Sequence, residues 1–97
     1  MATYIALANF TDQGIRTVKD TAKRSDAVRE QARRFGVTVK EILWTLGSYD
    51  LVVISEAPND EAVTALGLHL GAAGNVRTQT LRAFSREEMT AILGKLG

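Results

Sequence analysis

The sequence predicts an α+β fold in which two helices cross a four-stranded antiparallel sheet. Three observations predict it. Apolar runs of strand length alternate with segments of helical periodicity, glycines separate the two kinds of segment, and a glycine turn joins two strand-like runs in mid-chain. The chain has 97 residues, the size of one domain, so we expect a single domain over residues 1–97.

The beginning of the chain predicts a strand followed by a helix. Tyr4–Phe10 is a nearly continuous apolar run, which is typical of a short strand. A polar segment interrupts it. The helix that follows is expected to begin at Asp20 or Thr21, whose short polar side chains favour the cap position, and to run to Phe35. Gly36 then stops it, as glycine commonly does just past a helix end.

The middle of the chain predicts a β-hairpin. Val37–Leu46 alternates in the manner of a strand, and Leu51–Ser55 is β-branched and apolar. Between them, Gly47–Asp50 has the composition of a tight turn. A tight turn pairs the residues that flank it, and the antiparallel register then places Glu41 opposite Glu56.

The last part of the chain predicts a helix, a strand and a terminal helix. Asn59 or Asp60 is expected to cap the first of these helices. Asn75–Phe84 reads as the last strand. Ser85 and Glu88 have the spacing of a capping box and open the terminal helix. The apolar stripe of that helix consists of Met89, Ile92, Leu93 and Leu96.

The resulting order of elements is β-α-β-β-α-β with an additional helix, which is the ferredoxin-like arrangement. Right-handed crossovers place both connecting helices on one face of a sheet whose strand order is 4-1-3-2. The other face of the sheet is then open.

Both faces of the hairpin are predicted to be apolar. The register places Ile42, Trp44, Leu46, Leu51 and Val53 on one face, and Val39, Leu43, Val52 and Ile54 on the other. Two helices cover only one face, and monomers seldom expose a large apolar patch. We therefore expect a homodimer that forms through the open sheet faces. The alternative is a monomer in which the C-terminal helix folds back over the open face.

Composition narrows the classes of function. The chain has no cysteine, which excludes disulfides and thiolate sites and fits a reducing cytoplasm, where we expect the protein to work. It has no apolar run of about 20 residues, so no membrane partner is expected. Its net charge is +1, so it has no general attraction for nucleic acid. No cofactor or metal is expected, because the one histidine is isolated from other ligand types.

Four residues are candidates for catalysis. Glu41 and Glu56, if directly opposed, need a cation, a shared proton or an arginine to offset their repulsion, and such a pair can provide a general base. The alternative is that they lie in water or that a bulge separates them. His69 is a candidate base because imidazole exchanges protons near neutral pH, although a lone helical histidine is commonly structural. Tyr49 is a candidate proton acceptor at the hairpin turn.

Five residues are candidates for a ligand or subunit contact. Tyr49 and Asp50 either line a pocket mouth or serve the turn itself. Trp44 either floors a pocket or anchors an interface. Arg77 and Arg82 on the last strand either bind an anion or protect a sheet edge from aggregation.

Several blocks of sequence carry a resemblance to a known family: Phe10–Gly14, Gly47–Val53, Glu56–Pro58, Gly74–Thr78 and Thr80–Phe84. With these blocks in this order, the chain resembles the GYD domain family over nearly its whole length. The resemblance implies a ferredoxin-like fold related to the dimeric α/β barrels. It implies no catalytic residue.

Three functions are compatible with these features. The first is a small homo-oligomeric binding or regulatory module, which holds a small ligand at the sheet or at the dimer interface. It is favoured because the sequence contains no catalytic constellation. The alternative is a cofactor-independent enzyme of the dimeric α/β-barrel type, an isomerase or monooxygenase acting on a small apolar substrate, with His69, Glu56 or Tyr49 as proton acceptor. The third is a structural partner in a larger assembly.

Overall fold

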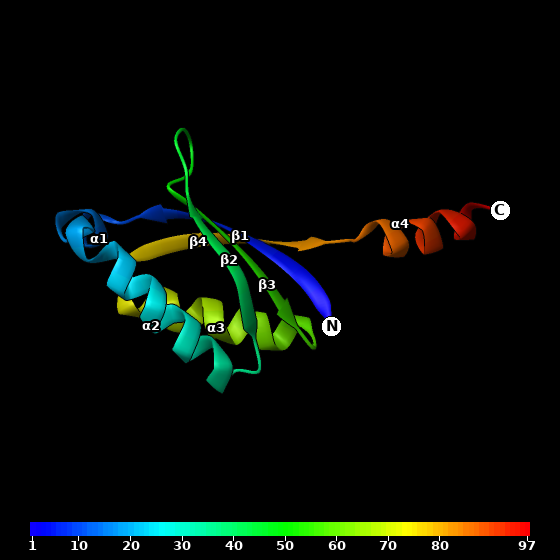
Figure 1. Ribbon diagram of the computed structural model, residues 1–97, viewed down its shortest axis with the longest axis horizontal. Coiled ribbons are helices and arrows are strands. Elements are labelled where there is room, and N and C mark those ends of the chain that lie inside the picture. The colour runs from blue at the N-terminus through cyan, green and yellow to red at the C-terminus, as the bar shows by residue number, and fades with distance from the viewer.

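A computed structural model describes residues 1–97 (Figure 1). Its elements are β1 (Ala2–Phe10), α1 (Asp12–Arg16), α2 (Thr21–Arg34), β2 (Thr38–Trp44), β3 (Leu51–Ala57), α3 (Asp60–Ala73), β4 (Val76–Ala83) and α4 (Arg86–Leu93), with short 3-10 helices at Val18–Asp20 and Gly94–Leu96. The strands form one antiparallel sheet in the order β2-β3-β1-β4. This order confirms the predicted α+β fold, since it is 4-1-3-2 read from the opposite edge. Helices α2 and α3 lie together on one face of the sheet.

Two of the three predicted helix caps are present, whereas Asp20 stands at the cap position of α2 without making a side-chain cap hydrogen bond. The Asn59 side chain accepts a hydrogen bond of 2.9 Å from a backbone N–H in the first turn of α3. Ser85 and Glu88 form the capping box of α4. The structure adds the short helix α1, in which the Thr11 hydroxyl accepts from the Gly14 N–H at 3.0 Å. None of the helices is both long and apolar enough to cross a membrane.

The connection between β2 and β3 is longer than predicted. Trp44 pairs with Leu51, so residues 45–50 form a loop and Leu46 lies fully exposed in it. The reason is the position of Asp50, which is bound to β1. Its carboxylate accepts from the Phe10 N–H, and its own N–H donates to the Ala8 carbonyl, both at 2.9 Å. A residue tied to the neighbouring strand is not free to close a tight turn.

The prediction that Glu41 lies directly opposite Glu56 is also wrong. A β-bulge at Lys40 shifts the register, so that Glu41 pairs with Ile54 and Glu56 pairs with Thr38. The Lys40 ammonium instead lies 3.9 Å from the Glu56 carboxylate. The bulge relieves the repulsion of opposed like charges and inserts one residue into the alternation of the strand.

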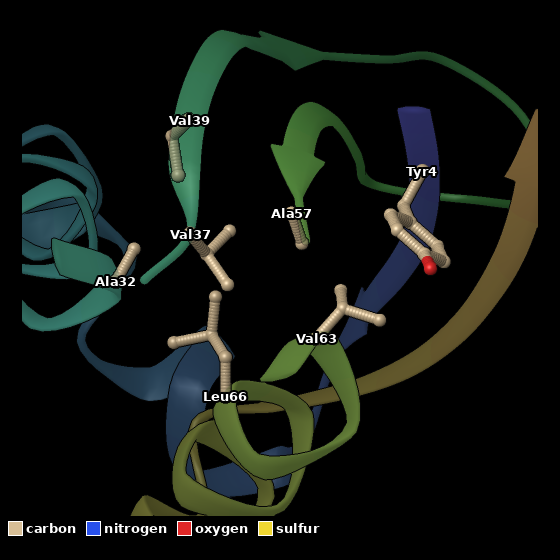
Figure 2. Close-up of a cluster of buried hydrophobic side chains, with 7 residues drawn as sticks. All are labelled: Tyr4, Ala32, Val37, Val39, Ala57, Val63 and Leu66. Carbon is tan, nitrogen blue, oxygen red and sulfur yellow. The ribbon is translucent and has the colours of Figure 1, made fainter. Parts of the chain in front are cut away.

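The same bulge separates Val39 from Leu43, Val52 and Ile54, with which it was predicted to share a face, and places it in the core. Val39 pairs with Ser55 and is buried. Figure 2 shows the core cluster, which lies between the sheet and the two crossover helices. Its seven side chains are those of Tyr4, Ala32, Val37, Val39, Ala57, Val63 and Leu66. Most are small, so the core is narrow.

Much of the chain therefore stays in contact with solvent. Only 11 of the 97 residues are buried. The accessible surface is 6558 Å², whereas a folded monomer of this size is expected to expose about 5,400 Å². The radius of gyration is 14.6 Å, against about 12.5 Å for a compact domain of this length.

Part of this excess comes from residues 84–97, which we call the C-terminal arm. The arm contains α4 and projects from the end of β4, away from the sheet and the other helices (Figure 1). The long axis of the molecule reaches 52 Å as a result. The alternative in which this helix folds back over the open face is wrong.

We predict that Gly14→Ala strongly destabilises the fold. A Cβ atom at Gly14 would lie 1.9 Å from the Asn75 carbonyl oxygen. The two segments have no freedom to separate, because Thr11 is hydrogen-bonded to the backbone of both Gly74 and Asn75. Such overpacking is expected to lower the free energy of unfolding by about 2 kcal/mol or more, measured by urea denaturation.

The matched control for this prediction is Gly71→Ala in α3, where a Cβ would meet no atom within 4 Å. That change is expected to stabilise the chain by about 0.5–1 kcal/mol, since alanine favours the helix interior. Equal urea midpoints for the Gly14 variant and the unmodified chain would contradict the predicted clash.

Candidate functional site

The face of the sheet opposite the helices carries a continuous apolar surface. Residues paired across antiparallel strands share a face, and the pairing links all four strands. Ile5 pairs with both Ile54 and Leu81, while Val52 pairs with both Leu7 and Leu43. We call this set the open-face patch: Ile5, Leu7, Leu43, Val52, Ile54 and Leu81. Leu43 and Leu81 are 46% and 41% exposed, and the other four are half-buried.

Polar groups surround the open-face patch. Glu41 and Glu56 lie beside it on the same face, paired with Ile54 and with Thr3. The Tyr49 hydroxyl reaches across from the hairpin loop to the Gln79 side-chain oxygen at 3.1 Å. An apolar centre within a polar rim is the arrangement found at protein–protein interfaces.

A second cluster of polar side chains lies on the helix side of the sheet. The Tyr4 hydroxyl donates a 2.5 Å hydrogen bond to the Asp60 carboxylate at the start of α3. This bond, which is lost when the phenol ionises, raises the pKa of Tyr4, and burial adds to the shift. A raised pKa keeps the Tyr4 phenol protonated at neutral pH, so no phenolate is present there to accept a proton. The bond instead fastens α3 to β1.

Arg82 connects this cluster to the C-terminal arm. Its guanidinium lies 5.8 Å from the centre of the Tyr4 ring and 4.5 Å from that of Phe84. It also donates to the Glu88 carboxylate at 3.0 Å. The Ser85 backbone N–H and then Arg82 hold the pKa of Glu88 below its usual range. Arg82 is thus a structural link between β4 and α4.

The structure does not bring the four catalytic candidates together. His69 lies in the helix layer, where its ring packs 5.5 Å from that of Phe35. Glu41 and Glu56 lie on the opposite face of the sheet. Tyr49 belongs to the hairpin loop.

The contact candidates are also dispersed. The Trp44 indole donates to the Thr21 hydroxyl at 3.0 Å, which joins β2 to the start of α2 and places Trp44 on the helix side. Asp50 is engaged with β1, as described above. Arg77 is exposed on the edge strand β4. Sequence reasoning missed the pairing of Tyr4 with Asp60, because no local pattern links residues 56 positions apart.

We predict that Asp60→Asn lowers the pKa of Tyr4 toward the ordinary tyrosine value of about 10. The substitution removes the carboxylate charge and weakens the bond that holds the phenolic proton. A raised folded-state pKa contributes stability below the unfolded value, and this contribution is lost as the pH rises through the folded value. Tyrosinate absorbance in a Tyr49→Phe background, where Tyr4 is the remaining tyrosine, measures the shift. An unchanged alkaline titration would show that Asp60 does not control Tyr4.

Comparison with known proteins places the chain in a family. The family model described as the GYD domain matches residues 4–93. A Thermus thermophilus protein named "Glutamine synthetase and cystathionine beta-lyase binding protein" is 37% identical over 94 residues, which cover 96% of this chain and 99% of the relative. No solved structure matches the chain significantly. The family match and the full-length relative agree with the blocks of sequence noted above, and the chain therefore belongs to the GYD domain family.

Proposed function

We propose that this chain is a homodimeric binding module that attaches to a metabolic enzyme and regulates it. The observation that carries the proposal is the uncovered open-face patch, which spans all four strands. We propose that a second copy covers this patch. The patch is apolar at its centre on every strand and has charges only at its rim, so two identical patches can pack together without burying charges at the centre. Two such faces packed together would form the middle of a sandwich.

The exposed area is of the order that such a dimer buries. The chain exposes about 1,100 Å² more than a compact monomer of its size, and the open face shares this excess with the C-terminal arm. A typical stable interface buries about 800 Å² on each partner. Burying about 600 Å² of apolar surface contributes on the order of 15 kcal/mol before the costs of association.

The relative's name supports the second half of the proposal. That protein is named for binding glutamine synthetase and cystathionine beta-lyase. We propose that the present chain likewise binds an enzyme of the glutamine synthetase kind. Its lack of cysteine is compatible with the cytoplasm, and we propose that it works there.

We predict that the purified chain is a dimer at micromolar concentration and that Leu43→Glu makes it a monomer. Leu43 is already 46% exposed in the single chain, so the substitution leaves the fold intact. In the dimer it would bury an unpaired carboxylate, which is expected to weaken association by at least about 100-fold. Size-exclusion chromatography with light scattering measures both states. Leu46→Glu, in the exposed loop outside the patch, is the control and should remain dimeric. A monomeric unmodified chain would overturn the proposed dimer.

We also predict that the chain co-elutes with purified glutamine synthetase from the same source. The expected result is a shift of the small chain into the enzyme's chromatographic peak, with an unrelated protein of similar size left unshifted. Native mass spectrometry of the complex gives its stoichiometry. Separate elution of an intact dimer and the enzyme would contradict the enzyme partner while leaving the dimer in place.

A further inference from the structure

The space between the sheet and the two crossover helices is filled at one end and hollow at the other. The core cluster of Figure 2 fills the end where α2 ends and α3 begins. At the other end, near Phe10 and the start of α2, the structure leaves an inner hollow of about 70 Å³. An outer hollow of about 130 Å³ adjoins it between α2 and α3, and both are lined by Arg24, Val28, Leu70 and Val76.

The inner hollow exists because α2 presents small side chains to the sheet. Thr21, Ser25 and Val28 recur at spacings of four and three residues, which puts them on one face of the helix. All three line the inner hollow, as does the small side chain of Ala8 on β1. Most of the remaining wall is apolar. An unfilled apolar hollow costs stability because its lining lacks contacts, and a ligand that fills it supplies them.

Arg24 is the one charged residue that lines either hollow. It is half-buried, and its guanidinium lies 6.0 Å from the centre of the Phe10 ring, which forms part of the inner wall. It donates to the Thr17 carbonyl and hydroxyl at 3.0 and 2.7 Å and to the Gly14 carbonyl at 3.1 Å. These bonds use three of the five guanidinium N–H groups, so two have no partner in the chain.

The chain does not neutralise the charge of Arg24. All of its acceptors are uncharged, and it forms no ion pair with a carboxylate. Arg82, which is also half-buried, is by contrast paired with Glu88. Hydrogen bonds between a guanidinium and a carboxylate are short and strong, and more so away from water. The hollow therefore combines apolar walls with one cation that is free to bind an anion.

We propose that this hollow binds a small aliphatic carboxylic acid, whose carboxylate pairs with Arg24 and whose tail lies against the apolar walls. The two hollows together are of the order of the cavity of about 150 Å³ that accommodates benzene, so a chain of about six carbons fits. Ala27 and Ala73 line the outer hollow and are exposed, so the outer hollow opens to solvent between the helices. The site lies on the helix side of the sheet, and the proposal neither uses the open-face patch nor rests on the proposed dimer.

Three probes with the same tail test the choice of head group. Hexanoate, hexanol and hexylammonium are titrated into the unmodified full chain while the methyl NMR signals of Val28, Leu70 and Val76 are followed. Hexanoate should shift these signals saturably and bind at least about tenfold more tightly than hexanol, because only the carboxylate pairs with the guanidinium. Hexylammonium should bind most weakly of the three. Equal affinities for hexanoate and hexanol, or no saturable shift with hexanoate, would overturn the proposal.

The substitution Arg24→Gln should weaken hexanoate binding at least about tenfold while changing hexanol binding by less than about twofold. Arg29→Gln is the matched control, because Arg29 lies on the same helix and donates to the Val39 carbonyl at 3.0 Å but lines neither hollow. It should leave both affinities unchanged. An equal loss for the two probes in Arg24→Gln would show that Arg24 only supports the local fold, and would overturn the proposal.

A second substitution, Val28→Phe, tests the hollow without removing the charge. The larger side chain occupies part of the space and should weaken hexanoate and hexanol alike by at least about tenfold, with urea denaturation verifying that the variant is folded. Unchanged hexanoate binding by the folded variant would place the ligand elsewhere and overturn the proposal. The probe titrations use the unmodified chain, so they test the site even where a variant fails to fold.

Discussion

The main constraint on this molecule is that two crossover helices cover only one face of a four-stranded sheet. The covered face builds a narrow core from small residues, with Tyr4 as its one aromatic member. The opposite face repeats apolar residues on all four strands. Its exposure, together with that of the arm, accounts for a surface well above that of a compact monomer. Self-association is the simplest way for such a chain to complete its burial of apolar area.

Two features of the β2–β3 hairpin decide which of its residues face the helices and which lie on the open face. The bulge at Lys40 lets β2 place Val39 in the core and Leu43 on the open face, which strict alternation would not allow. Asp50 fixes the other end of the hairpin by bonding to β1. Since these two features set the pairing of β2 and β3, they also determine which side chains a partner would meet.

The fold was largely predictable from the sequence, because periodicity, caps and glycines act locally. Leu43, Val52 and Ile54 were correctly predicted to share a face even though the loop was longer than predicted, since the register moved by an even number of residues. Val39 was wrongly grouped with them, because an alternating strand gives no sign of where a bulge lies. The Tyr4–Asp60 bond joins residues that are distant in sequence, and the outward course of the arm is a matter of how the elements are placed in space, so local patterns carry no information about either.

The single tether of the arm has a consequence for how the protein opens. Apart from the chain itself, the ion pair of Arg82 with Glu88 joins α4 to β4, so α4 is able to unravel while the sheet stays intact. Acid favours this fraying, because Glu88 supports the helix only while ionised, and its support is lost as the pH falls through its depressed pKa. Limited proteolysis at a pH below the ordinary glutamate pKa of about 4.5 would accordingly trim this end first and leave a folded remnant.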